Sequence, residues 1–186
     1  MVNHVMVADW HNVTDWGEQN RMSKRVNFKA GNHVVYPAHG VGKVIAIEER
    51  TVSGYELEML VIEFEKEKML LRIPTTKVQT AGLRTLSTKK EMQNALKTLK
   101  GKVRIKRTMW SRRAQEYEAK INSGDPVLVA EVVRDLHRNA DQPDQSYSER
   151  QIYQAALERL CRELAVVEKI DEDKAVERVD TVLQAA

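Results

Sequence analysis

The sequence predicts an α+β protein with two domains, a small antiparallel β-barrel of Tudor or SH3 type followed by an all-α bundle of five helices. Two observations carry this prediction. Short runs rich in β-branched and aromatic residues, joined by tight turns, fill residues 28–74. After Gly82 the apolar residues recur at helical spacing, and capping residues separate the runs. We therefore expect a disordered tail over residues 1–22, the barrel over residues 23–86 and the helical domain over residues 87–186.

The expected barrel has short strands that alternate with turns. Turn sequences stand at residues 37–42 (PAHGVG), at Ser53-Gly54 and at Lys66-Glu67, and Pro74 closes the last strand. Between these turns the sequence predicts strands over residues 33–36, 43–51, 57–64 and 69–73. Short strands at this spacing are typical of a small barrel.

Five helices are expected in the second domain. The first begins with a capping box, in which Thr88 and Glu91 can each accept a hydrogen bond from the other's backbone. The second helix carries Trp110, and the third begins at Asp125-Pro126, an N-cap residue followed by proline. For the fourth helix we expect a capping box of Ser148 and Gln151, and for the fifth a start at residues 171–173, where three acids favour the positive end of the helix dipole.

Charge is distributed unevenly along the chain. The formal net charge is +3, but residues 86–140 carry +7 and residues 141–186 carry −5. The block from Lys89 to Arg113 holds ten Lys or Arg and one acid. A local patch of this kind attracts a polyanion such as nucleic acid. Trp110 near its end is either a flat ring for contact with bases or, since Tyr117 follows at helical spacing, the first core residue of a helix.

Several classes of protein are not supported by the sequence. A single cysteine, Cys161, excludes an internal disulfide and fits a reducing compartment. No apolar run is long enough to span a membrane, and residues 1–21 lack the pattern of a secretory signal, so we expect a cytoplasmic protein. Residues 37–43 resemble a phosphate-binding loop, but Pro37 replaces its first glycine and Val44 its Mg²⁺-binding hydroxyl. We therefore expect no enzyme activity, no metal site and no cofactor.

Four motifs together resemble the CarD family of bacterial transcription regulators, also called CdnL. They are residues 35–42 (VYPAHGVG), 72–74 (RIP), 110–113 (WSRR), and 123–125 (SGD) running into 130–136 (AEVVRDL). The resemblance extends from Phe28 to the C-terminus and leaves out residues 1–22. The first domain also resembles the polymerase-interacting module of the bacterial transcription-repair coupling factor.

The resemblance implies a protein that binds RNA polymerase through its β subunit and meets promoter DNA at the upstream edge of the melted bubble. The positions that match the polymerase contact are Arg50, Arg72 and Pro74. The motif tryptophan would enter the minor groove with little sequence specificity and slow the collapse of the bubble. The DNA-binding residues expected on this basis are Trp110, Arg112, Arg113, Lys106 and Arg107.

The resemblance also implies a monomer associated with the nucleoid. One departure concerns residues 114 and 115, where some members carry an aromatic residue and a base and this chain has Ala114 and Gln115. Two other classes of function fit parts of the sequence. One is a DNA-binding protein that acts without polymerase and without sequence specificity. The other is an adaptor that reads peptides through the barrel and dimerises through the bundle.

Overall fold

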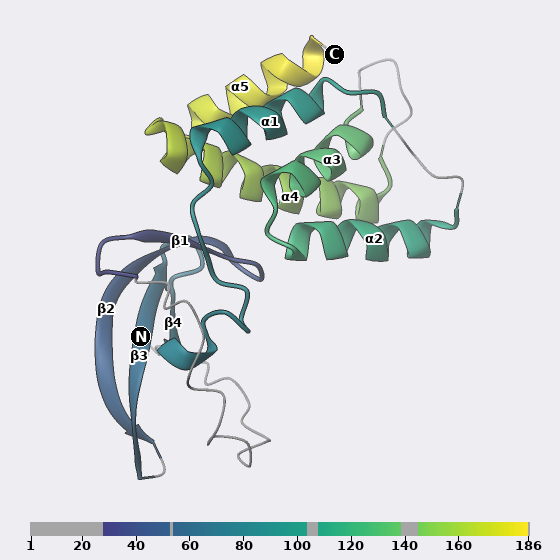
Figure 1. Ribbon diagram of the computed structural model, residues 1–186. Coiled ribbons are helices and arrows are strands. Elements are labelled where there is room, and N and C mark those ends of the chain that lie inside the picture. Colours follow the sequence, from purple (N-terminus) through teal and green to yellow (C-terminus); the bar gives the residue numbers. More distant parts are fainter. Residues whose placement is uncertain (1–27, 53, 104–107, 139–144, 186) are drawn as a thin grey trace. The chain divides into compact units, whose positions relative to one another are not determined.

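A computed structural model describes residues 28–52, 54–103, 108–138 and 145–185 of the chain (Figure 1). The expected tail over residues 1–22 and two of the expected DNA-binding residues, Lys106 and Arg107, lie outside the described residues. The chain divides into two compact units. The first contains the described residues up to Val34 together with Gly42–Arg84, and the second contains Val35–Val41 and Thr85–Ala186.

Five antiparallel strands form one sheet with the order β4-β3-β2-β1-β5. The strands are β1 (His33–Tyr36), β2 (Gly40–Val52), β3 (Tyr55–Phe64), β4 (Met69–Pro74) and β5 (Arg84–Thr85), and a short 3₁₀ helix, η2 (Thr75–Lys77), follows β4. The strands expected from the sequence are present, and β5 is an addition to them. The sheet pairings give an open sheet, so the closed barrel that the sequence predicts is not shown.

Buried side chains of β2 and β3 form the core of the sheet. Burial alternates along the first half of β2, whereas Met59–Ile62 on β3 are buried in succession. On β3, Leu60 and Ile62 are almost fully buried, as is Phe64 at its end. Gly42 on β2 has to be glycine, because a Cβ atom there would stand 2.6 Å from Ile62 Cγ2 and 2.8 Å from Phe64 Cε1. Side chains of β3 therefore fill the space that any larger residue at position 42 would need.

The five helices predicted from the sequence are all present. They are α1 (Lys89–Leu99), α2 (Trp110–Asn122), α3 (Pro126–Leu136), α4 (Tyr147–Glu168) and α5 (Glu172–Gln184). The capping box of Thr88 and Glu91 begins α1, and the Asp125 side chain accepts hydrogen bonds from the backbone of Val127 and Leu128 at the start of α3. The helix boundaries at these points follow the capping chemistry that the sequence displays.

The start of α4 differs from the prediction. Its N-cap is Ser146, whose Oγ accepts from the backbone nitrogen of Glu149 at 3.3 Å, while Glu149 Oε2 accepts from the backbone nitrogen of Ser146 at 3.0 Å. The expected box of Ser148 and Gln151 was wrong by two residues. Glu149 is thereby the third residue of α4 and lies in its first turn.

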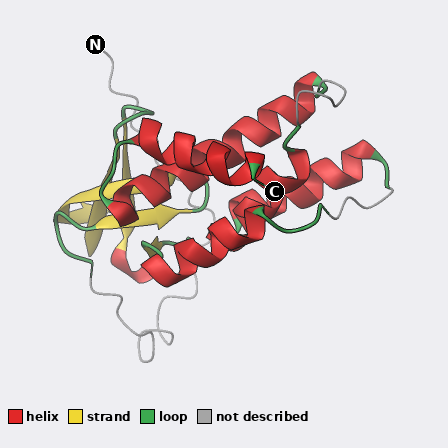
Figure 2. Cartoon of the chain, turned by 90° about the horizontal axis from the view of Figure 1, so that it is seen from above, coloured by secondary structure: helices red, strands yellow, loops and turns green. Residues whose placement is uncertain are grey.

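In the helical unit α3 packs against α1, α2 and α4, and α5 packs against α4 and α1. Figure 2 shows the helices in red. Leu99, Val132, Leu136, Leu160 and Leu164 are among its most deeply buried side chains. Each helix contributes one apolar face to this core, as the helical spacing predicts. None of the described helices combines the length and the hydropathy needed to cross a membrane.

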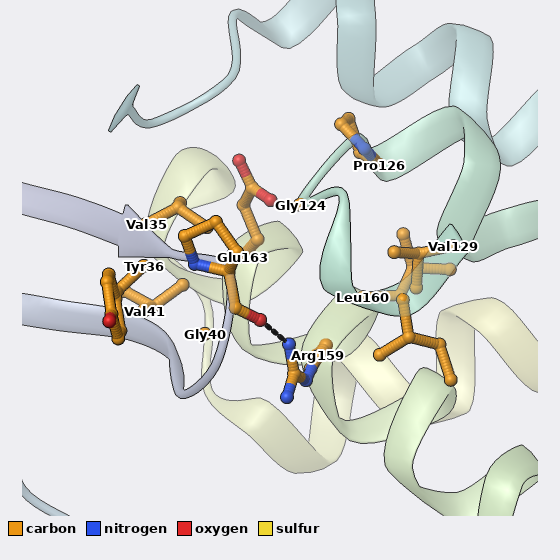
Figure 3. A pocket seen from close by; sticks show the side chains of 12 residues that line it. Val35, Tyr36, Gly40, Val41, Gly124, Pro126, Val129, Arg159, Leu160 and Glu163 are labelled. Carbon is orange, nitrogen blue, oxygen red and sulfur yellow. Dashed lines mark hydrogen bonds between the residues drawn. The ribbon is translucent and has the colours of Figure 1, made fainter. Parts of the chain in front are cut away.

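The turn at Val35–Val41 belongs to this second unit (Figure 3). The Arg159 guanidinium on α4 donates hydrogen bonds to the carbonyl oxygen of Pro37 and, at 2.6 Å, to that of Ala38. Gly40 adopts φ +80°, a conformation that side chains disfavour. Helix α4 thus contacts the PAHG motif through the backbone carbonyl groups of Pro37 and Ala38. The positive φ of Gly40 is the structural reason for glycine at that position.

Candidate nucleic-acid and protein interfaces

Trp110 begins α2, and its indole ring lies partly buried against the core of the helical unit. The ring centroid is 6.4 Å from that of Tyr117, at an interplanar angle of 50°. Met109 precedes it as N-cap and makes no side-chain capping bond. Trp110 is therefore both a packing residue and a partly accessible ring, because one part of the indole packs on the core and another reaches solvent.

The two arginines after Trp110 have different surroundings. Arg112 is exposed, whereas the Arg113 side chain is only 19% exposed and its Cζ stands 5.3 Å from the centre of the Trp110 ring. Arg113 Nη2 is 4.0 Å from Glu149 Oε1 at the start of α4, and Arg138 Nη2 is 3.9 Å from the same oxygen. Arg112 is therefore free to approach a phosphate, while Arg113 is already engaged with a ring and a carboxylate.

Two exposed apolar side chains that the sequence did not single out lie close to this site. Met109 directly precedes Trp110, and Tyr147 lies in the first turn of α4 together with Glu149. The side chains of Met109 and Tyr147 are each 78% exposed. A single exposed apolar side chain is common on protein surfaces, so neither residue alone marks a binding surface. The predicted start of α4 lay two residues later, so Tyr147 fell outside the expected helix.

Burial raises the pKa of the Tyr117 hydroxyl above its usual value, and the nearby Asp135 carboxylate raises it further. Asp135 is itself buried and pairs with Arg134, whose Nη2 is 2.7 Å from Asp135 Oδ1. The arginine compensates the charge of the buried carboxylate, which would otherwise destabilise the fold. Tyr117 therefore stays neutral and supports the Trp110 ring by packing.

The residues expected to contact polymerase lie on one face of the sheet. In the strand register Ala46 opposes Val61, which opposes Arg72, while Glu48 opposes Met59, which opposes Pro74. Opposed residues of antiparallel strands share a face, and so do residues two apart on one strand. Arg50 on β2 is therefore on the same face as Arg72 and Pro74.

Glu48 stands between the two arginines of this face. Its Oε2 is 3.3 Å from Arg50 Nε and 3.5 Å from Arg72 Nε. The Arg50 side chain is 53% exposed and that of Arg72 is 22% exposed, while Pro74 is buried. The structure thus brings Arg50 and Arg72 together around one carboxylate, with Arg50 the more accessible of the two.

The part of the chain that the structure describes contains a small cavity and no group suited to binding a metal ion. A cavity of about 20 Å³ lies between the turn at Val35–Val41 and helices of the second unit (Figure 3). A cavity of this size holds about one water molecule. Among the described His, Cys, Asp and Glu residues, no group of three or more is placed to bind a metal ion.

Comparison with known proteins matches both parts of the chain to domains of one family. Residues 28–87 match the model of the CarD-like/TRCF RID domain, and residues 94–180 match that of the CarD C-terminal domain. The chain belongs to the CarD family. The resemblance drawn from the four sequence motifs is thereby confirmed, and the family is one of transcription factors that act on RNA polymerase, rather than a class of enzymes.

One relative in the CarD family is YdeB of Bacillus subtilis (strain 168), a candidate transcription factor by its description. It is 30% identical over 145 residues, which cover 78% of this chain and 95% of YdeB. A solved structure, the 72-residue N-terminal domain of Myxococcus xanthus CarD determined by NMR, is 30% identical, and the match covers 38% of this chain and 93% of that one with a TM-score of 0.29. The family assignment rests on the two models and on YdeB.

Proposed function

We propose that this CarD-family protein binds the β subunit of RNA polymerase through its sheet and stabilises the open promoter complex through Trp110. The observation that supports the proposal is the presence of the two family domains, in this order, in one chain. Arg50 and Arg72 share one face, and Trp110 and Arg112 follow each other at the exposed start of α2. The protein acts in the cytoplasm, as a monomer.

The partly exposed Trp110 ring enters the minor groove at the upstream edge of the bubble. Insertion of an apolar side chain between base pairs costs a few kcal/mol per step for unstacking, and the cost falls where the duplex is already distorted. Trp110 therefore binds open promoter DNA more tightly than closed duplex. Only such a difference in affinity shifts the equilibrium toward the open state.

Phosphate contacts add affinity that is independent of base sequence. Arg112 makes one such contact from its exposed position, and Arg113 makes a weaker one because Glu149 and Trp110 already hold it. Lys106 and Arg107, which precede Trp110 in the sequence, supply two further cations for phosphate contact. Few contacts of this kind give weak binding on their own, so attachment to polymerase raises the effective concentration of Trp110 at the junction.

The test compares two charge-reversal variants with the wild-type protein in a pull-down with the purified β subunit and in a DNA-binding assay without polymerase. The proposal predicts that Arg50→Glu loses binding to the β subunit and keeps its affinity for free DNA. If the protein acts on DNA alone, neither the wild-type protein nor Arg50→Glu would bind the β subunit. Arg112→Glu should give the converse result, with polymerase binding retained and DNA binding weakened.

A further inference from the structure

Glu149 connects the first turn of α4 to the tryptophan that begins α2. Its two carboxylate oxygens have separate partners. Oε2 accepts the hydrogen bond from the backbone of Ser146 that closes the capping box, and Oε1 faces Arg113 at 4.0 Å and Arg138 at 3.9 Å. The Glu149 side chain is 16% exposed, so these charges meet in a place with limited access to water. Capping and ion pairing are thus carried by different atoms of one residue.

Arg113 is the link between Glu149 and the Trp110 ring. It stands three residues after Trp110, so the two side chains lie on the same side of α2. Its guanidinium lies over the ring, and its Nε is buried without a hydrogen-bond partner among the described residues. The orientation of Arg113 therefore depends on its stacking on Trp110 and on the negative charge of Glu149.

We infer that Glu149 is a positioning residue for Trp110. By holding Arg113 against one side of the ring, with Tyr117 packed nearby, it fixes the orientation in which the indole meets DNA. A side chain already held in its bound orientation loses less conformational freedom when it binds. The inference rests on the proposed function, in which Trp110 contacts the edge of the bubble.

The sign of the effect separates positioning from simple electrostatics. Loss of an acid near a DNA-binding surface ordinarily strengthens binding, because the acid repels phosphates. If Glu149 positions Trp110, its neutralisation shortens the lifetime of the open complex although the protein has become more positive. The two roles of Glu149 therefore predict changes in opposite directions.

The substitution Glu149→Gln isolates the charge, because glutamine at the third helical position also serves a capping box. The matched control is Glu158→Gln, which removes the same charge from the same helix, where Glu158 Oε2 is 3.6 Å from Arg162 Nη2. Both changes are made in a protein whose other tryptophans are replaced (Trp10→Phe and Trp16→Phe), so that fluorescence reports Trp110 alone. Circular dichroism establishes that each variant is folded.

Two measurements are made on these variants, acrylamide quenching of Trp110 fluorescence and the lifetime of the open complex with purified polymerase. For Glu149→Gln we expect stronger quenching and a lifetime shortened about two- to fivefold, the factor that corresponds to a cation–π contact at an exposed site. Glu158→Gln should leave the quenching unchanged and should not shorten the lifetime.

The Trp110→Ala variant, measured in parallel, distinguishes the two ways in which this account can fail. If Trp110→Ala leaves the lifetime unchanged, the proposed function is wrong and the role of Glu149 falls with it. If Trp110→Ala shortens the lifetime while Glu149→Gln leaves it unchanged or lengthens it, the proposed function stands and the positioning role is overturned. Unchanged acrylamide quenching in Glu149→Gln also overturns that role.

Discussion

Replacement of Trp110 by alanine should lower both the stability of the protein and the lifetime of the open complex, by amounts that differ from those of a core residue. A packed aromatic side chain buries about 150–250 Å², and truncation of a fully buried tryptophan costs about 3–5 kcal/mol. Trp110 is partly exposed at the first residue of α2, where water can fill the space that the ring leaves. We therefore expect a loss of about 2 kcal/mol in the free energy of unfolding.

A loss of this size leaves the protein folded, since domains are typically stable by about 5–15 kcal/mol. Urea unfolding followed by circular dichroism measures the loss. Dissociation of the open complex after addition of a competitor measures its lifetime, which we expect to fall about tenfold, equivalent to about 1.4 kcal/mol of differential binding. Trp110→Phe is the control, because it keeps an apolar ring that can pack against Tyr117 and enter the groove.

Two results would contradict this prediction for Trp110. An unfolded Trp110→Ala protein would show that the ring is primarily a core residue. A folded variant with the wild-type lifetime of the open complex would show that the exposed part of the ring does not contact DNA.

Three further predictions follow from the remaining contacts. Arg50→Glu and Arg72→Glu should each abolish retention on the polymerase β subunit, and Arg72→Glu should also lower stability because its side chain is the more buried; retention of both variants would contradict the assignment of this face. Arg112→Gln should reduce the slope of log binding constant against log salt by about one unit, and Arg113→Gln by less, because Arg113 is already paired; equal reductions would show equal phosphate contacts. Burial raises the pKa of Tyr153 to about 12, against about 10 in the unfolded chain. The free energy of unfolding should therefore decline by on the order of 1–2 kcal/mol as the pH rises from 10 to 12. Urea unfolding of Tyr153→Phe across this range should show a smaller decline, and an identical decline would exclude Tyr153 as its source.

The helical domain could be predicted because its signals are local. Thr88 and Glu91 satisfy each other's hydrogen bonds within four residues, and the structure keeps that capping box unchanged. The start of α4 shows the limit of such signals. Ser146 with Glu149 and Ser148 with Gln151 have the same spacing, and both pairs can close a capping box. The pair that is used also places a carboxylate beside Arg113 and Arg138, a tertiary contact that the local pattern does not contain.

The candidate sites were predicted in part for a similar reason. The motif residues were found from the family resemblance, but their surroundings depend on contacts between distant segments. Glu48 comes between Arg50 and Arg72 only because β2, β3 and β4 pair in one register. Closure of the sheet into a barrel likewise depends on pairing between strands, which the pattern of each strand does not specify.

The covered position of Arg113 could not be read from the sequence WSRR, in which Arg112 and Arg113 look equivalent. Their difference arises from helix geometry, since residue 113 follows Trp110 by three positions and lies beside it, whereas residue 112 points elsewhere. The partly buried state of Trp110 depends in turn on Tyr117, two turns further along α2. These contacts become predictable once the first residue of α2 is known.

The lifetime of the open promoter complex, measured with purified RNA polymerase in the presence and absence of this protein, tests whether the protein stabilises the open state. We expect a longer lifetime with the wild-type protein, and no lengthening at the same concentration with Arg50→Glu, which lacks the attachment to the β subunit. A lifetime that the wild-type protein leaves unchanged, or that Arg50→Glu lengthens equally, would contradict this expectation.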